Sequence, residues 1–238
     1  MPHDLIFQAD EATKTYRSTV HDEARREWRA LTLLARHAPG LAPRPVRARL
    51  DAVPPMIVMS RLPGVPLGPE LLRSHPRLLP LLAEAVHRLH DCLPEAALAR
   101  LPRRAGHAAA MLEVVRALHL TAEPGAAVDA CGEWLGGAEF GASGDPVLGT
   151  GDGNLANFLW DGTAVRVIDF EYAGRSDRAF ELAEVIEHLS ADDPDALAAA
   201  LGDVPGLLEA RRLMASYWFL RAGGRERAQR VLRLMTAG

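Results

Sequence analysis

A chain of 238 residues can bury a full hydrophobic core, as one domain or as two small lobes. Hydrophobic residues make up 48% and charged residues 24% of it, which is ordinary for a globular protein, and a net charge of −4 does not favour nonspecific binding to nucleic acid. We find no apolar core of signal-peptide length at the N-terminus and no stretch near the ~20 apolar residues of a membrane helix. The two cysteines, Cys92 and Cys131, show no pairing or zinc-binding pattern, so we expect a cytoplasmic protein.

The first forty residues predict two strands and a helix. Leu5–Phe7 is typical of a strand, and Ala12–Tyr16 returns after a turn at Asp10-Glu11. The chain's single lysine, Lys14, lies in the second strand. Apolar residues then recur at helical spacing over His21–His37, and Pro39-Gly40 ends that helix.

The rest of the chain is mainly helical. An apolar strand is predicted at Pro54–Met59, and Ser60–Gly64 connects it to the first of a series of helices. We expect helices from Glu70 onward and at Arg103–Leu120, Ala126–Leu135, Arg178–Leu189, Gly206–Ala222 and Arg225–Met235. Strands followed by runs of helices predict an α+β fold.

One stretch, Leu148–Leu182, gathers the polar residues that suggest chemistry. Strand-like runs at Asn157–Trp160 and Ala164–Phe170 flank Asp161-Gly162, which is a strong signal for a hairpin with a tight primed turn. Such a hairpin brings its outer ends together, so Asp152 and Asn157 should lie near Asp169. Phosphoryl transfer needs such a set, because Mg²⁺ takes hard oxygen ligands and a further carboxylate must orient the attacking hydroxyl.

These residues follow a known pattern. Asp152 precedes Asn157 by five positions, and Ile168-Asp169-Phe170-Glu171 follows at a strand end, as in the Asp-x-x-x-x-Asn and Asp-Phe-Gly motifs of kinases. In both motifs, and in Asp177–Ala183, the chain resembles the aminoglycoside phosphotransferase and choline kinase-like family. The resemblance spans roughly residues 5–220 and is most specific in the central stretch. It implies a two-lobed protein-kinase-like fold, with a small nucleotide-binding lobe at 1–60 and a helical lobe at 61–238.

The resemblance also implies roles for individual residues. Asp152 would be the catalytic base that accepts the proton of a substrate hydroxyl, and Asn157 and Asp169 would hold Mg²⁺. Lys14 would contact the α- and β-phosphates of ATP and pair with Glu27, with Glu23 as the second choice. Backbone groups from Met59 to Arg61 would meet the adenine, although Arg61 itself has no firm role. The acceptor would be a small hydroxylated molecule, such as an aminoglycoside or an amino alcohol, with no nucleic acid or membrane as partner.

Two features depart from the family pattern. Thr150 stands where the family has a histidine that braces the loop, which puts the rigidity of the loop in question. The thirteen residues before Lys14 leave room for about one strand of ~5–6 residues and a turn, with no Gly-rich loop to cover the phosphates. The first lobe is thus abbreviated. A non-catalytic nucleotide- or ligand-binding protein on the same fold is therefore the alternative, whereas retention of the Asp152, Asn157 and Asp169 set favours an enzyme.

Three other groups could be functional. His87 and His90 are spaced to face one metal ion but lack a third ligand, so we favour a structural interpretation. Asp192, Asp193 and Asp195 could cradle an amine-rich substrate, but a helix N-cap before Pro194 is the simpler interpretation. Glu171 is a candidate to face the acceptor.

Overall fold

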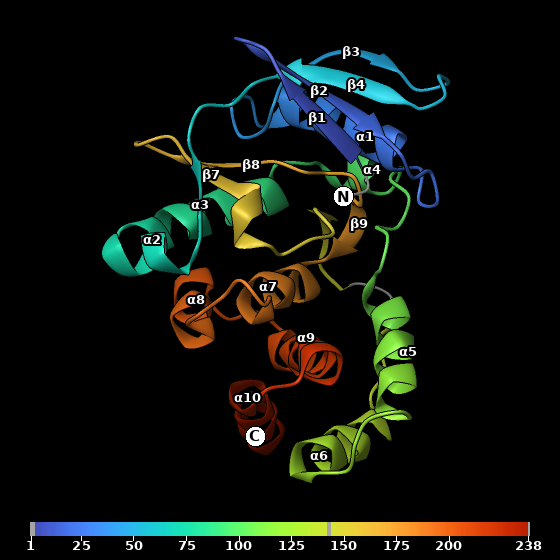
Figure 1. Cartoon of the computed structure of the whole chain (residues 1–238), viewed down its shortest axis with the longest axis vertical. Helices are drawn as coiled ribbons and strands as arrows, with labels where there is room; N and C mark the ends of the chain where they lie inside the picture. The colour runs from blue at the N-terminus through green and yellow to red at the C-terminus, as the bar shows by residue number, and fades with distance from the viewer. Residues whose placement is uncertain (1–2, 142–143, 238) are drawn as a thin grey trace.

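A computed structural model describes residues 3–141 and 144–237. A small antiparallel sheet lies at one end and a stack of helices at the other, with short strands between them (Figure 1). The α+β architecture predicted from the sequence is therefore confirmed. The lobe boundary at residue 60 stays a prediction.

The small sheet has the strand order β1-β2-β4-β3. Its strands are antiparallel neighbours and span His3–Phe7 (β1), Glu11–Tyr16 (β2), Pro45–Arg49 (β3) and Met56–Ser60 (β4). One described strand, β1, precedes the strand of Lys14, as the spacing predicts. Burial alternates along β2, so that Ala12, Lys14 and Tyr16 point inward.

Helix α1 (Glu23–His37) packs against β3 and β4 and presents its buried face, including Leu31 and Leu34, to the sheet. Glu27 lies on this face, one helical turn before Leu31, and is buried with it. The periodicity of the sequence therefore places a carboxylate inside the molecule, where it needs a cationic partner.

The helical part follows a short connection through β5 (Val65–Pro66). Its helices are α2 (Pro69–Ser74), α3 (Leu78–Asp91), α4 (Glu95–Leu98), α5 (Ala108–His119), α6 (Ala126–Leu135), α7 (Arg178–Glu187), α8 (Pro194–Leu201), α9 (Leu207–Ala222) and α10 (Arg225–Thr236). Helix α7 packs on α8 and α9, and α9 packs on α5 and α10. None of the helices in the described part of the chain is both long and apolar enough to cross a membrane. The helix expected from Arg103 begins five residues later, with His107 as its N-cap.

Two small ladders position the central stretch. Strands β6 (Pro146–Gly149) and β9 (Gly174–Asp177) are antiparallel, and Gly149 lies opposite Gly174. Strands β7 (Phe158–Trp160) and β8 (Val165–Val167) form the expected hairpin, after a short 3₁₀ helix at Leu155–Asn157. The β6–β9 ladder joins the segment before the hairpin to the one after it, and the β7–β8 ladder joins the two strands of the hairpin itself, so the loop of Asp152 and the loop of Asp169 lie together.

The turn of this hairpin differs from the prediction. Trp160 pairs with Val165, so four residues form the connection, and Gly162 has a positive φ of 99° whereas Asp161 does not. The primed two-residue turn was wrong because Asp161 acts through its side chain. Its Oδ1 accepts hydrogen bonds from the backbone N–H groups of Ala164 and Thr163, which hold the pKa of this carboxyl well below its usual range.

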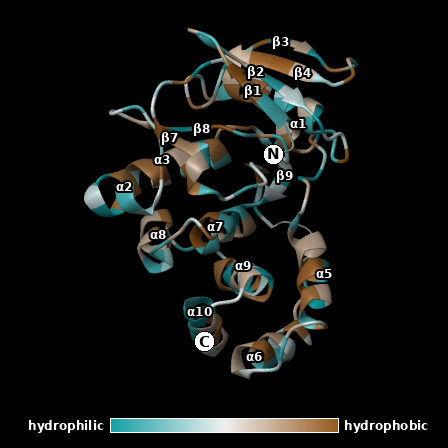
Figure 2. Ribbon diagram, viewed as in Figure 1, coloured by the Kyte–Doolittle hydropathy of each residue, from teal (hydrophilic) through white to brown (hydrophobic). Residues whose placement is uncertain are grey.

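A single main core joins the sheet to the helices. Figure 2 shows hydrophobic residues along β4 and α3, which face this core. The largest buried side chains include Phe158, Phe170 and Phe180, one from the hairpin, one from the loop after β8 and one from α7. The candidate site is therefore built on rigid, fully packed elements.

One buried histidine makes stability depend on pH. His90 on α3 is buried, its Nδ1 has no partner among the described residues, and burial lowers its pKa from 6.5 to about 4. As the pH falls, the unfolded chain takes up this proton before the folded chain does, so we expect a loss of roughly 3 kcal/mol in unfolding free energy between about pH 6.5 and about pH 4. Urea unfolding of the wild type and His90→Gln across this range isolates the effect; a constant difference between the two proteins would contradict it.

Candidate active site

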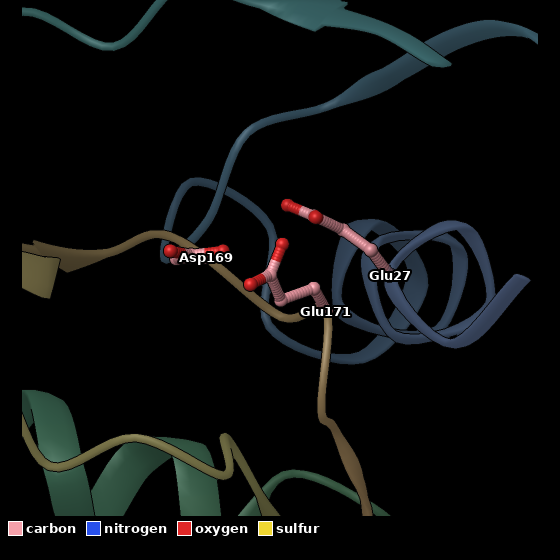
Figure 3. Close-up of side chains that lie close together, drawn as sticks. All are labelled: Glu27, Asp169 and Glu171. Atoms are coloured by element: carbon pink, nitrogen blue, oxygen red, sulfur yellow. The ribbon is translucent and has the colours of Figure 1, made fainter. Parts of the chain in front are cut away.

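The centre of the candidate site is the ammonium group of Lys14. Its Nζ lies 2.8 Å from Glu27 Oε2, 2.6 Å from Asp169 Oδ1 and 3.1 Å from Glu171 Oε2. Glu27 comes from α1, and the other two carboxylates come from the segment that follows β8 (Figure 3). Tyr16 O–H donates to Glu27 Oε2 at 2.6 Å, and His3 Nδ1 lies 2.9 Å from Glu171 Oε2. Lys14 thus links the sheet to the segment of Asp169.

The charges of this cluster do not balance. Burial alone would lower the pKa of Lys14, but the carboxylates of Glu27, Asp169 and Glu171 outweigh it and raise that pKa above its ordinary value. Lys14 therefore stays an ammonium group. Three carboxylates around one ammonium group leave excess negative charge, which favours a further cation.

Asp169 is the cluster's exposed member. Its side chain is 26% exposed, whereas those of Glu27 and Glu171 are almost fully covered. Its backbone adopts a positive φ of 68°, which is uncommon for a residue with a side chain and clusters at functional sites. The left-handed conformation turns the chain sharply after β8.

The three carboxylates are also the group that could hold a metal ion among the described residues, since their ligand atoms lie within 4.8 Å of one another. Glu27 is already engaged by Lys14 and Tyr16, so we consider it a partner of Lys14 and not a ligand. Asn157, predicted as the second ligand, is buried beside this segment, because its carbonyl accepts the N–H of Ile168 at 2.9 Å. Its Nδ2 is buried without a partner among the described residues. The Asp169 carboxylate, whose Oδ1 also accepts a hydrogen bond from Lys14, and the side-chain amide oxygen of Asn157 are oxygen ligands of the kind that Mg²⁺ takes.

Asp152 lies on the neighbouring loop, with its side chain 38% exposed. Its Oδ1 accepts the backbone N–H of Asn154 at 3.0 Å and faces His188 Nε2 at 3.7 Å. Asn154 in turn caps the short 3₁₀ helix, since its Oδ1 accepts the N–H of Ala156. The carboxylate is therefore held at one oxygen and open at the other.

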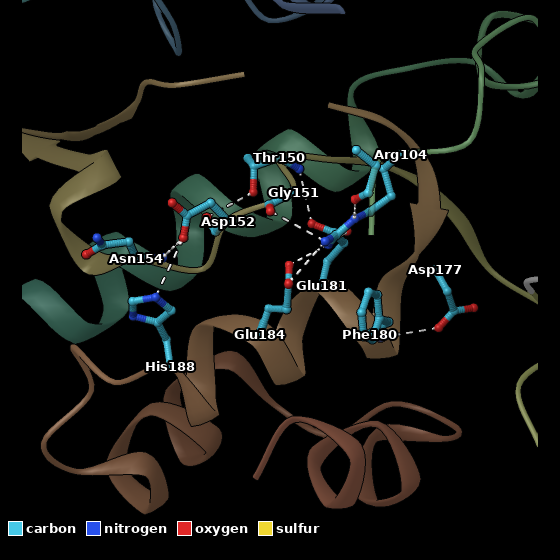
Figure 4. A network of polar contacts seen from close by, with 11 residues as sticks. Arg104, Thr150, Gly151, Asp152, Asn154, Asp177, Phe180, Glu181, Glu184 and His188 are labelled. Carbon is cyan, nitrogen blue, oxygen red and sulfur yellow. Dashed lines mark hydrogen bonds and ion pairs between the residues drawn. The ribbon is translucent and has the colours of Figure 1, made fainter. Parts of the chain in front are cut away.

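A buried arginine fixes this loop to α7. Arg104 forms ion pairs with Glu181 at 2.7 Å and with Glu184, and its Nη2 donates to the carbonyl of Gly151 at 3.4 Å (Figure 4). Glu181 also accepts the backbone N–H of Thr150 at 3.1 Å. Nothing in the sequence singled out Arg104, because its partners are about eighty positions away. Glu181 thus joins Arg104 and the backbone of Thr150 in one network.

Thr150 contributes directly to the rigidity of the loop. Its hydroxyl donates to the carbonyl of Asp152 at 3.3 Å, and the residue is buried. The histidine expected at this position is thus replaced by a shorter side chain, with Arg104 and Glu181 bracing the backbone on either side.

The glycines of the loop are explained by packing against the protein. A Cβ on Gly153 would lie 2.3 Å from the carbonyl oxygen of Glu184, and one on Gly151, where φ is +88°, would lie 2.4 Å from the side chain of Tyr172. Glycines in such a loop could also allow close approach to phosphate. Their observed role is to let the loop rest on α7 and on the segment after Asp169.

A cavity of about 300 Å³ opens between the sheet and the hairpin. Lys14 and Asp169 lie in its wall. Its other wall includes Met59, Ser60, Arg61 and Leu62 of the connection after β4, together with Phe7, Ala12, Leu159 and Ile168. A largely apolar cavity with a few charged groups in its wall is the form that a site for a small ligand takes.

The connection after β4 is already partly hydrogen-bonded. The N–H of Ser60 donates to Arg44 at 2.8 Å, and the N–H of Arg61 donates to Asp10 at 2.8 Å. The Arg61 guanidinium stacks over Phe7, 5.4 Å from the ring centroid. Met59 and Arg61 thus line the cavity, but these two backbone donors are used within the protein.

The remaining candidates are engaged elsewhere. Asp192 pairs with Arg73, Asp193 caps α8 by accepting the N–H of Ala196, and Asp195 pairs with Arg230. Glu171 contacts Lys14 and His3. His87 and His90 belong to no group of three metal-ligating side chains in the described part of the chain. The simpler interpretation of the acidic cluster, an N-cap before Pro194, is confirmed for Asp193.

Arg104→Met tests the buried anchor. The change removes the cation and leaves Glu181 and Glu184 buried without a cationic partner, so we expect unfolding free energy to fall by about 3–5 kcal/mol. Arg17→Met is the matched control, because the Arg17–Asp4 pair is exposed and its loss should change the free energy of unfolding very little. Urea denaturation measures both. Equal effects of the two substitutions would show that the Arg104 cluster does not hold the loop.

Comparison with known proteins agrees with this geometry. Residues 12–217 match the phosphotransferase enzyme family. No curated protein sequence matches the chain. Among solved structures, a choline/ethanolamine kinase family protein from Mesorhizobium loti is similar, with a TM-score of 0.68 and 17% identity, over 100% of this chain and 86% of that one.

Two further structures share the fold. The GDP complex of an aminoglycoside 2′-phosphotransferase has a TM-score of 0.68 and 19% identity, over 99% of this chain and 87% of that one. A spectinomycin phosphotransferase in complex with ADP and spectinomycin has a TM-score of 0.62 and 11% identity, over 99% and 84%. At these identities the likeness shows the fold, and the family follows from the match over residues 12–217. The chain therefore belongs to the phosphotransferase enzyme family.

Proposed function

We propose that this protein transfers the γ-phosphoryl group of ATP to a hydroxyl of a small molecule, with Asp152 as the base, and that it does so in the cytoplasm. The observation that carries this proposal is the placement of Lys14. A lysine fixed by a helix glutamate, beside an exposed carboxylate at the wall of a cavity, is the arrangement with which kinases hold ATP phosphates.

Each residue has a role set by its position. Lys14 binds the α- and β-phosphates, and Glu27 keeps its ammonium group in place. The cavity wall from Met59 to Leu62 contacts the nucleotide base. Asn157 and Asp169 hold Mg²⁺, which neutralises the charge that develops on the phosphates when it is bound.

Transfer forms one bond and breaks another. The acceptor oxygen bonds to the γ-phosphorus while the bond from that phosphorus to the β-phosphate oxygen breaks, which releases ADP. The hydroxyl proton moves to the free carboxylate oxygen of Asp152, which is on a loop fixed by Arg104 and Thr150. A rigid loop matters because misplacing a reacting group by about 1 Å can cost on the order of 10²-fold in rate.

The acceptor remains a hydroxylated small molecule, such as an aminoglycoside, an amino alcohol or another metabolite. Pairing of Asp192 and Asp195 with arginines, and the capping role of Asp193, leave no free acidic cradle in that cluster for a polyamine. A test panel should therefore include neutral and anionic alcohols beside the cationic ones.

The second candidate is a non-catalytic nucleotide-binding protein. The observation in its favour is that one strand and a tight turn precede the strand of Lys14 among the described residues, with no glycine-rich loop between them. Such a protein would bind Mg²⁺-ATP but would not consume ATP. Binding would raise the melting temperature of the protein.

Asp152→Ala separates the two candidates. Loss of a general base typically costs 10²–10⁴-fold in rate, so we expect acceptor-dependent ATP consumption to fall by at least about a hundredfold while Mg²⁺-ATP binding stays intact. The control is Asp203→Ala, which removes an exposed carboxylate. Full activity of the Asp152→Ala variant would show that Asp152 is not the base.

Asp169→Asn tests the metal site. The substitution keeps the size of the side chain and removes its charge. The affinity for ATP should then be the same in the presence of Mg²⁺ as in the presence of a chelator that removes the ion. Isothermal titration calorimetry with and without Mg²⁺ measures the difference. An unchanged dependence on Mg²⁺ would show that the ion is held elsewhere.

A further inference from the structure

His188 follows the last residue of α7 and faces the proposed base. Its Nε2 lies 3.7 Å from Asp152 Oδ1, and its side chain is 13% exposed. No role for this histidine follows from the sequence, because Asp152 lies far from it in the chain and on a separate loop. The two side chains point toward each other in Figure 4.

The hydrogen bonds of His188 decide which nitrogen carries its proton. The backbone N–H of Ser190 donates to Nδ1 at 3.0 Å, so Nδ1 is an acceptor and, in the neutral ring, the hydrogen is on Nε2. Nε2 is the nitrogen that faces Asp152, 3.7 Å from Oδ1. The ring thus offers the carboxylate a donor without adding a full positive charge.

Two contacts fix the ring in place. The Ser190 hydroxyl lies 2.8 Å from Nδ1 and accepts the backbone N–H of Leu155 at 2.9 Å, which ties the histidine to the end of the Asp152 loop. On its other side, the ring packs edge-on against Trp218 of α9, with 4.9 Å between centroids. These contacts hold the His188 ring between the end of the Asp152 loop and α9.

The two oxygens of Asp152 differ as a result. Oδ1 accepts the N–H of Asn154 and faces His188, whereas Oδ2 accepts no hydrogen bond from a described residue. An acceptor hydroxyl would thus meet Oδ2. The carboxylate must be held in one rotamer for this oxygen to point in a constant direction.

We propose that His188 is the positioning residue of Asp152: its neutral Nε2–H group holds Oδ1 and thereby presents Oδ2 to the acceptor hydroxyl. The inference rests on the proposed phosphoryl transfer. A neutral donor suits this task, because a permanent cation beside Asp152 would lower the affinity of the base for a proton.

The surroundings keep the ring neutral. Burial lowers the pKa of His188, and the charge of Asp152 opposes this effect. A polar cavity of about 550 Å³ lies beside the ring and is lined by charged groups of both signs, which oppose one another: Glu187, Asp192, Glu226, Arg227, Arg230 and Arg233.

A matched pair of variants tests the role. His188→Phe keeps the ring and its packing against Trp218 but removes both nitrogens, whereas His188→Gln places an amide donor where Nε2 was. We expect His188→Phe to lower kcat by about tenfold or more with little change in either KM, because a misplaced base slows the transferring step. His188→Gln should restore most of the lost rate.

Three results would overturn the role. The first is a wild-type kcat in His188→Phe. The second is an equal fall in kcat in both variants together with a lowered melting temperature. The third is an unchanged kcat with a raised KM for the acceptor. The melting-temperature shift with Mg²⁺-ATP is the folding control, since the cavity that contains Lys14 does not include His188.

An NMR titration of the His188 ring tests the pair without any turnover. The charge of Asp152 raises the pKa of His188, so that pKa should be lower in Asp152→Asn than in the wild type. An unchanged pKa overturns the inference whatever the activity. A lowered pKa in a protein that phosphorylates no acceptor would overturn the proposed function and still support the contact between His188 and Asp152.

Discussion

The structure depends on one buried ammonium group. Lys14 lies in the sheet, Glu27 in the helix against it, and Asp169 and Glu171 in the segment that follows the central hairpin. A buried charge is tolerated only when it is paired, so these elements have to meet at this point for the fold to form. The same pairing leaves excess negative charge beside an open cavity. A constraint on folding and the proposed site for a metal–nucleotide complex thus both depend on a single cluster.

A second buried cation, Arg104, joins elements of the helical part, as Lys14 joins the sheet to the segment of Asp169. Arg104 joins Glu181 and Glu184 of α7 to the backbone of the Asp152 loop. The two ladders between these clusters, β6–β9 and β7–β8, fix the distance between the loop of Asp152 and the segment of Asp169. Rigid support on both sides is what a phosphoryl-transfer site needs, because its catalysis is almost entirely positioning and electrostatic stabilisation.

Local signals in the sequence predicted part of this arrangement. The hairpin around Asp161 brought Asn157 beside Ile168, whereas the pairing of Lys14 with Glu27 was implied by the family resemblance. Arg104 and His188 were missed because each acts through residues far away in the chain, and only the folded backbone brings them together. The role of the loop glycines could not be predicted from the sequence, because packing against α7 has no local signature. The predicted turn type was wrong for a different reason, because the Asp161 side chain competes with the backbone for the same hydrogen bonds.

The central claim is that Asp152 and the Lys14 cluster act on one phosphoryl group. The most direct test is phosphorus NMR of the products after the protein is incubated with Mg²⁺-ATP and a panel of cationic, neutral and anionic alcohols. We expect a new phosphate-ester signal that needs both the acceptor and Asp152 and that appears in step with ADP. Mg²⁺-ATP binding with no ester from any acceptor, in both the wild type and Asp152→Ala, would contradict it and favour a protein that binds nucleotide without using it.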